Sequence, residues 1–173
     1  DLVIRRGHPG DFAAACALLR EADELHARLA PSYFRNAARA EADWRALVGA
    51  PDAGVFVAEA AAGLAGAAIV RVYDTPPDPS MVPLRRAHLE ALVVTAGRRR
   101  GGIGARLMDE AAAWARRQGA VELVLTVWAG NDAAQAFYER LGYRELSRVL
   151  STKLGPGWSP AVSPSSGADA APA

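Results

Sequence analysis

The sequence predicts a single α/β domain of the α+β kind, with elements in the order β-α-α-β-β-β-α-β-α-β. Its length of 173 residues, with 51% hydrophobic and 23% charged residues, fits one globular core. Short β-branched runs recur between stretches with helical periodicity. Clusters of Gly and Pro separate these runs, as connections between regular elements do.

The N-terminal third predicts a strand followed by two helices. Residues 2–6 are rich in β-branched and aliphatic side chains, and Pro9 then opens a helix. The apolar positions of this helix recur at helical spacing at Phe12, Cys16 and Leu19. A second helix is expected over residues 36–48, where Ala, Glu and Arg dominate and Trp44 begins an apolar side.

The middle of the chain predicts a hairpin and a further strand. Residues 55–59 and 64–73 are β-rich and flank a short turn ending at Gly63. The connection over residues 74–79 contains three prolines, which remove backbone donors, so it is expected to be exposed. A strand over residues 87–95 follows.

The C-terminal third predicts a helix, a strand, a helix and a last strand. Over residues 102–118 one apolar stripe runs through Ile103, Leu107, Ala111 and Trp114. A strand over 121–128, a helix from Asn131 to 141 and a strand over 143–154 are expected next. We therefore assign residues 1–154 to one domain. Residues 155–173 are expected to be a disordered tail or linker, because they hold four of the eleven prolines and a single charge.

Composition narrows the function classes. A net charge of +1 argues against a nucleic-acid partner. The single cysteine, Cys16, cannot form an intramolecular disulfide, and no Cys/His spacing predicts a metal site. No apolar run approaches the roughly 20 residues that span a bilayer. We therefore expect a cytoplasmic protein without a membrane partner, and a homodimer stays open.

A glycine-rich turn over residues 98–105 predicts an anion site. It lies between a strand and an amphipathic helix, whose first amide groups lack intrahelical partners. A P-loop would need Lys followed by Ser or Thr, but Ala105 and Arg106 stand there. A dinucleotide fingerprint would need a small residue where Leu107 stands.

Three motifs resemble those of the GNAT family of N-acetyltransferases. Residues 99–104, Arg-Arg-Gly-Gly-Ile-Gly, resemble its Gln/Arg-x-x-Gly-x-Gly/Ala signature. Residues 89–94 resemble the strand before that signature, and residues 131–143 resemble its Asn-x-x-Ala-x-x-Phe-Tyr segment. The resemblance implies a mixed, mostly antiparallel central sheet of about six or seven strands flanked by about four helices, with acetyl-CoA as cofactor.

The resemblance also implies site residues. Coenzyme A is expected to contact the strand, the turn and the following helix at Leu92, Val93, Val94, Arg99, Arg100, Gly101, Gly102, Ile103, Gly104, Ala105, Asn131 and Tyr138. The strand is expected to diverge from the next one, so that the pantetheine arm pairs with it and the N–H of Leu92 or Val93 polarises the thioester. The three arginines either bind further phosphates or face solvent.

The family resemblance implies two catalytic residues. Glu90 would be the general base, and Tyr138 would donate a proton to the leaving thiolate. Glu90 is expected on the face of Leu92; alternatively it binds the substrate cation or pairs with an arginine. His88 is a second candidate base. Tyr138 could instead be a core aromatic. Cys16 is expected to be a buried, inert thiol, so transfer would be direct, in a ternary complex.

The acceptor is expected to be a small-molecule amine, and the resemblance implies that residues 25–39 and 74–86 bind it. The irregular first segment interleaves aromatic and basic groups, and the second contains Asp74 and Asp78. Arg85 and Arg86 beside these acids argue against a strongly acidic funnel. An acetyltransferase acting on proteins or peptides, and a non-catalytic acetyl-CoA-binding module, remain alternatives.

Overall fold

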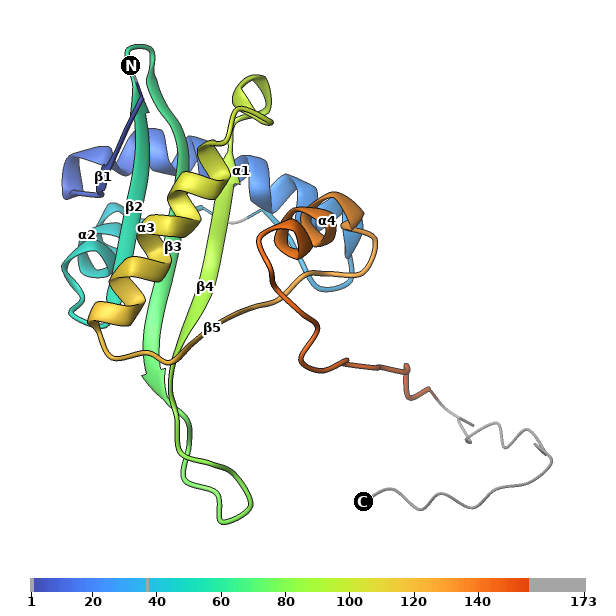
Figure 1. Ribbon diagram of the computed structural model, residues 1–173. Helices are drawn as coiled ribbons and strands as arrows, with labels where there is room; N and C mark the ends of the chain where they lie inside the picture. The colour runs from blue at the N-terminus through green and yellow to red at the C-terminus, as the bar shows by residue number, and fades with distance from the viewer. Residues whose placement is uncertain (1, 37, 156–173) are drawn as a thin grey trace. The chain divides into compact units, whose positions relative to one another are not determined.

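A five-stranded sheet forms the centre of the computed structural model, which describes residues 2–36 and 38–155 (Figure 1). Its strands follow one another across the sheet as β1 (Val3–Arg6), β2 (Ala53–Ala60), β3 (Gly63–Asp74), β4 (Arg85–Val94) and β5 (Glu122–Leu125). Neighbours are antiparallel except for β5, which runs parallel to β4. The expected mixed, mostly antiparallel sheet is confirmed, with fewer strands than the six or seven predicted.

Four helices accompany this sheet in the described residues. They are α1 (Phe12–Leu29), α2 (Glu41–Gly49), α3 (Ile103–Arg117) and α4 (Asp132–Arg140), with short 3-10 turns η1 (Pro9–Asp11) and η2 (Ala96–Arg98). Figure 1 shows α1 and α2 on one face of the sheet and α3 on the other. The predicted order of elements is confirmed as far as α4.

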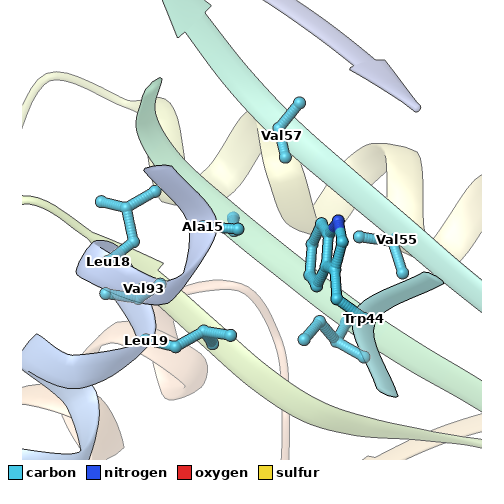
Figure 2. Close-up of a cluster of buried hydrophobic side chains, with 9 residues drawn as sticks. Ala15, Leu18, Leu19, Trp44, Val55, Val57 and Val93 are labelled. Carbon is cyan, nitrogen blue, oxygen red and sulfur yellow. The ribbon is translucent and has the colours of Figure 1, made fainter. Parts of the chain in front are cut away.

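The face beneath α1 and α2 carries the main core. Leu18 and Leu19 of α1 lie beside Val93 of β4, and Trp44 of α2 lies beside Val55 of β2, within one buried cluster (Figure 2). The Trp44 indole also donates a hydrogen bond of 3.1 Å to the carbonyl of His8, so its one polar atom is satisfied. Burial of these side chains fixes both helices on the sheet.

The opposite face is covered by the apolar stripe of α3, as its periodicity predicts. Ile103, Leu107, Ala111 and Trp114 are all buried. The Trp114 indole lies directly on the backbone of β2, because Gly54 has no side chain there. A Cβ at Gly54 would come within 2.8 Å of the indole. This packing sets the direction of α3 and therefore the place where its N-terminus lies.

Two elements are shorter than predicted. The second helix begins at Glu41 instead of near residue 36, since Ala40 is extended and Arg39 turns toward Asp23 of α1 in a two-pronged ion pair. Strand β5 covers Glu122–Leu125 instead of 121–128, because only these four residues have partners on β4. A strand ends where its ladder of hydrogen bonds ends.

The strand predicted over residues 143–154 is wrong. By their contacts the residues divide into Asp1–Gly142 and Tyr143–Ala173, and the described part of the second unit holds no strand. Its apolar side chains are exposed, with 94% of Val149 and 90% of Leu150 accessible. A β-rich run without a partner strand gains neither ladder bonds nor burial. Arg148 pairs locally with Glu145 instead.

The predicted tail falls almost wholly on residues 156–173, which lie outside the described residues. The domain boundary expected at residue 154 thus stays a prediction. No helix in the described part of the chain combines the length and apolar character needed to cross a membrane. Across residues 2–36 and 38–155, His, Cys, Asp and Glu side chains form no group of three that could hold a metal ion.

Candidate functional site

Strands β4 and β5 pair at one end and separate at the other. Their register runs from Arg86 opposite Glu122 to Leu89 opposite Leu125 and stops there. At the paired end the Arg86 and Glu122 side chains form a 2.8 Å ion pair. On its other edge β4 stays bonded to β3 as far as Val94. Residues Glu90–Val94 therefore present an open edge, as the predicted divergence requires.

Alternation of the backbone decides which groups face this edge. The N–H of Thr95 donates to Ala65 in a 3.0 Å bond, so Thr95 and, two residues earlier, Val93 turn toward β3. Leu92 and Val94 consequently direct their N–H groups to the open edge. The structure does not bring Val93 there, and its side chain is buried in the core under α1.

A β-bulge lies where the open edge begins. On β3, Val70 and Ile69 are adjacent, but their partners on β4 are Leu89 and Ala91, so Glu90 is an extra residue. Glu90 and Ala91 both line a cavity on the α1 and α2 face. Leu92 pairs with Ala68 on the α3 face. The prediction that Glu90 and Leu92 share a face is wrong, because the extra residue resets the alternation.

Glu90 is held by an arginine that nothing in the sequence singled out. Arg71 donates from Nε to Glu90 at 3.1 Å and from Nη1 to Asp52 at 2.8 Å. The hydrogen bond to Asp52, opposed by burial and reinforced by Glu90, raises the pKa of Arg71. The same bond lowers the pKa of Asp52. The guanidinium thus stays charged beside Glu90. His88 lies opposite Arg71 in the register, within the closed half of β4.

The glycine-rich turn continues directly from the open edge. Arg100 and Gly102 have φ angles of 65° and 79°, in the left-handed region that favours glycine. Gly102 is the N-cap of α3, and no side chain caps the helix. A Cβ would meet nothing within 4 Å at Gly102 and only a carbonyl oxygen 3.6 Å away at Gly101. The first amides of α3, from Ile103 to Ala105, therefore have no side-chain cap, and the two glycines before them leave room for a ligand.

One carboxylate of α1 holds the start of this turn. Glu21 accepts hydrogen bonds from the Thr95 hydroxyl at 3.0 Å and from the Ala96 N–H at 3.3 Å. Its Oε2 also lies 3.4 Å from Arg99, whose Nε donates to the Val94 carbonyl at 2.8 Å. Arg99 is thus engaged by the protein, whereas Arg98 and Arg100 are exposed. The sequence offers no signal for Glu21, which is 74 residues from Thr95.

The predicted helix after β5 lies against the N-terminus of α3. The Asn131 side chain accepts from the Ala134 N–H at 3.3 Å, which confirms it as the N-cap of α4. A Cβ at Gly104 would approach the Phe137 ring to 3.2 Å. Tyr138 is the neighbour of Phe137, with ring centroids 5.1 Å apart. The glycine turn and the segment of Tyr138 are therefore brought together.

A family model of the acetyltransferase (GNAT) family matches residues 17–143. The chain belongs to the GNAT family. It is therefore classed among the acyltransferases, and the match spans β4, the glycine turn and α4. A comparison with curated protein sequences gave no match.

Solved structures resemble the GNAT chain over most of its length. A variant of the BH1408 protein of Bacillus halodurans is 23% identical, with a TM-score of 0.83 over 88% of this chain and 99% of that one. The aminoglycoside 6′-N-acetyltransferase AAC(6′)-Ih of Acinetobacter baumannii is 19% identical (TM-score 0.66; 91% and 100% covered). AAC(6′)-Iy, solved with the bisubstrate analogue CoA-S-monomethyl-acetylneamine, is 21% identical, with a TM-score of 0.66 over 89% of this chain and 98% of that one. At these identities the likeness shows a shared fold.

A cavity of about 300 Å³ lies on the α1 and α2 face of the GNAT sheet and reaches the bulge. It is lined by Cys16, Leu19, Arg39, Ala40, Asp43, Trp44, Leu47, Ile69, Glu90 and Ala91. Cys16 is half-buried at this wall instead of fully buried as expected. Of the two segments expected to bind the acceptor, the first contributes Arg39 and residues 74–86 contribute nothing. In the second segment Asp74 pairs with Arg85, and Asp78 accepts from Ser80.

Proposed function

We propose that the protein is an acetyl-CoA-dependent N-acetyltransferase that transfers the acetyl group to a primary amine of a small molecule. One observation carries the proposal: the open edge of β4 leads, through η2 and the glycine turn, to the N-terminus of α3, which no side chain caps. An elongated thioester with a pyrophosphate end fits such a track, because an extended arm pairs with a strand edge and phosphates bind at helix N-termini.

Residues along this track would divide the work of holding the cofactor. The outward N–H groups of Leu92 and Val94 suit the amide-containing arm. The amides of residues 101–105 suit the pyrophosphate, where the missing Cβ atoms of Gly101 and Gly102 leave room. Arg98 and Arg100 supply positive charge for the remaining phosphate. The Asn131 side-chain oxygen caps α4, and within residues 2–36 and 38–155 its amide nitrogen has no hydrogen-bond partner, so this nitrogen would be available to the arm.

Acetyl-CoA, when bound, supplies an activated acyl group as a thioester. The outward N–H of Leu92 would stabilise negative charge on a carbonyl oxygen at the edge. An alkyl amine with a pKa of about 10 enters protonated, so a carboxylate is needed to attract it and take its proton. Glu90 serves both needs, directly or through water. The Tyr138 hydroxyl would donate a proton to the sulfur of the departing coenzyme A. No covalent enzyme intermediate is required, so a folded Cys16→Ala variant should still release thiol from acetyl-CoA.

Binding and turnover test the proposal separately. Acetyl-CoA at about 100 times its Kd should stabilise the protein by about 2.7 kcal/mol, measured by thermal unfolding. Release of free thiol is then followed with polyamines, aminoglycosides, simple alkylamines, amino acids and peptides. Absence of binding refutes the proposal. Binding without thiol release from any amine indicates a binding module, and a preference for peptides indicates a protein-modifying enzyme.

Variants at two positions test the assigned roles. Tyr138→Phe should lower kcat by at least about tenfold and change the Kd for acetyl-CoA little, because it removes one proton donor and no packing volume. Gly104→Leu should weaken cofactor binding itself, since the new side chain meets Phe137. The reverse pattern would show that the two roles are exchanged.

A further inference from the structure

The cavity beside the bulge has an apolar body and a charged rim. Leu19, Trp44, Leu47 and Ile69 form its walls, while Arg39, Asp43 and Glu90 supply its charges. The walls are prearranged: Leu19, Trp44 and Ile69 belong to the packed core, and each is at most 5% exposed. A ligand entering this cavity therefore meets fixed hydrophobic surfaces and a few polar groups.

The charges of the rim favour a cation. Arg39 donates hydrogen bonds of 2.6 and 2.9 Å to Asp23. The carboxylate compensates the positive charge of Arg39 and raises the pKa of the guanidinium. Glu90 shares Arg71 with Asp52. Asp43 has no hydrogen-bond or ion-pair partner within residues 2–36 and 38–155. In and beside the rim there are thus two guanidinium groups, of Arg39 and Arg71, and four carboxylates, of Asp23, Asp43, Asp52 and Glu90.

We infer that the acceptor is a compact amine with one cationic end on an apolar body, such as an aralkylamine, and that it binds in this cavity. The inference rests on the proposed function and names its substrate class. The cationic end lies toward Glu90 and Asp43, and Glu90 is the first residue beyond the last β4–β5 pair. The apolar body lies against Trp44, Leu47 and Ile69.

Cavity size argues against large polycations. About 300 Å³ is at the lower end of the range of about 300–1,000 Å³ for small-molecule sites. An aminoglycoside carries several ammonium and hydroxyl groups on linked rings. Against these walls most of its polar groups would lose water without gaining a partner, which is costly. A phenylethyl or comparable alkyl group loses nothing there and gains from burial.

The first experiment compares acceptors in the thiol-release assay with saturating acetyl-CoA. 2-Phenylethylamine should show a kcat/KM at least about tenfold above those of neamine, spermidine and a lysine-containing peptide, equivalent to about 1.4 kcal/mol. A higher value for any of the three competitors overturns the inference while leaving the acetyltransferase proposal intact.

A second readout does not depend on turnover. Cys16 is the sole cysteine of the chain and lies in the cavity wall. 2-Phenylethylamine should therefore slow alkylation of Cys16 by N-ethylmaleimide at least about threefold at saturation, whereas spermidine should not. Protection without thiol release from 2-phenylethylamine would show that the amine occupies the cavity but is not the acceptor, which overturns the inference and leaves the acetyltransferase proposal to the other amines of the panel. Absence of protection at concentrations that saturate the assay, or throughout the accessible range, would refute the inference.

A matched pair of variants locates the cationic end. Asp43→Asn should raise the KM for 2-phenylethylamine about fivefold, as expected for an ion pair worth about 1 kcal/mol, with kcat within about twofold. Glu41→Gln makes the same charge change in the first turn of α2, where Glu41 faces Arg45 and lines no part of the cavity. It should leave KM unchanged. Equal effects of the two variants would contradict the assignment of Asp43.

Discussion

The two halves of β4 belong to one strand but differ in how many of their edges are paired with a neighbouring strand. Arg85–Leu89 is bonded on both edges, carries the buried Ala87 and Leu89, and is tied to β5 by the Arg86–Glu122 ion pair. Glu90–Val94 is bonded on one edge only. One half therefore contributes stability, and the other keeps backbone groups available to a ligand. The bulge at Glu90 is the boundary, and variants on either side should separate stability from binding.

The largest effect is expected in the closed half. Leu89→Ala removes a side chain that is 5% exposed and should lower the free energy of unfolding by about 2–4 kcal/mol. Urea denaturation measures this loss. Among molecules that remain folded, the Kd for acetyl-CoA should stay within about twofold of the wild type. A large loss of affinity with little loss of stability would contradict the assignment of stability to the closed half and of ligand binding to the open half.

The next largest effect is expected where the open half reaches α3. Gly102→Val places a β-branched residue at φ 79°, which costs about 1–2 kcal/mol, and adds a side chain where phosphates are proposed to bind. Affinity for acetyl-CoA should fall at least about tenfold by calorimetric titration. Gly97→Ala is the control, because its Cβ would meet nothing within 4 Å. If both variants bind alike, the turn is not the phosphate site.

A smaller effect is expected at Glu21. Glu21→Gln keeps the shape of the side chain but removes the charge that holds Thr95, Ala96 and Arg99. The KM for acetyl-CoA should rise about threefold with kcat unchanged, since the residue positions the turn without touching the reacting atoms. Glu24→Gln on the exposed side of the same helix should have no effect. A fall in kcat alone would assign Glu21 a different role.

The smallest effect is expected for Arg86→Gln. The ion pair with Glu122 is partly exposed, with 20% and 40% of the side chains accessible, so its loss should cost about 0.5–1 kcal/mol of stability. Acetyl-CoA binding should not change. Thermal unfolding with and without acetyl-CoA measures both quantities on one sample. Weakened binding would show that the closed end also controls the width of the opening.

Local patterns predicted the elements that depend on local physics. The apolar stripe of α3, the glycine turn and the Asn131 cap each follow from residues within one or two turns of the chain. The orientation of Glu90 could not be predicted, because a bulge depends on register with β3. Arg71 and Glu21 act on residues 19 and 74 positions away. The strand expected after Tyr143 failed for the same reason, since strand propensity does not supply a partner.

Six consecutive residues of helix α1, from Cys16 to Glu21, contribute to both proposed binding sites. Cys16 and Leu19 line the acceptor cavity, and Glu21 holds the glycine turn. A single helix thus contacts both proposed sites, and we expect their affinities to be interdependent. Linkage requires the coupling to be reciprocal: if acetyl-CoA tightens amine binding by some factor, the amine tightens acetyl-CoA binding by the same factor. In equilibrium titrations of each ligand with and without the other, Glu21→Gln should bring that factor closer to one.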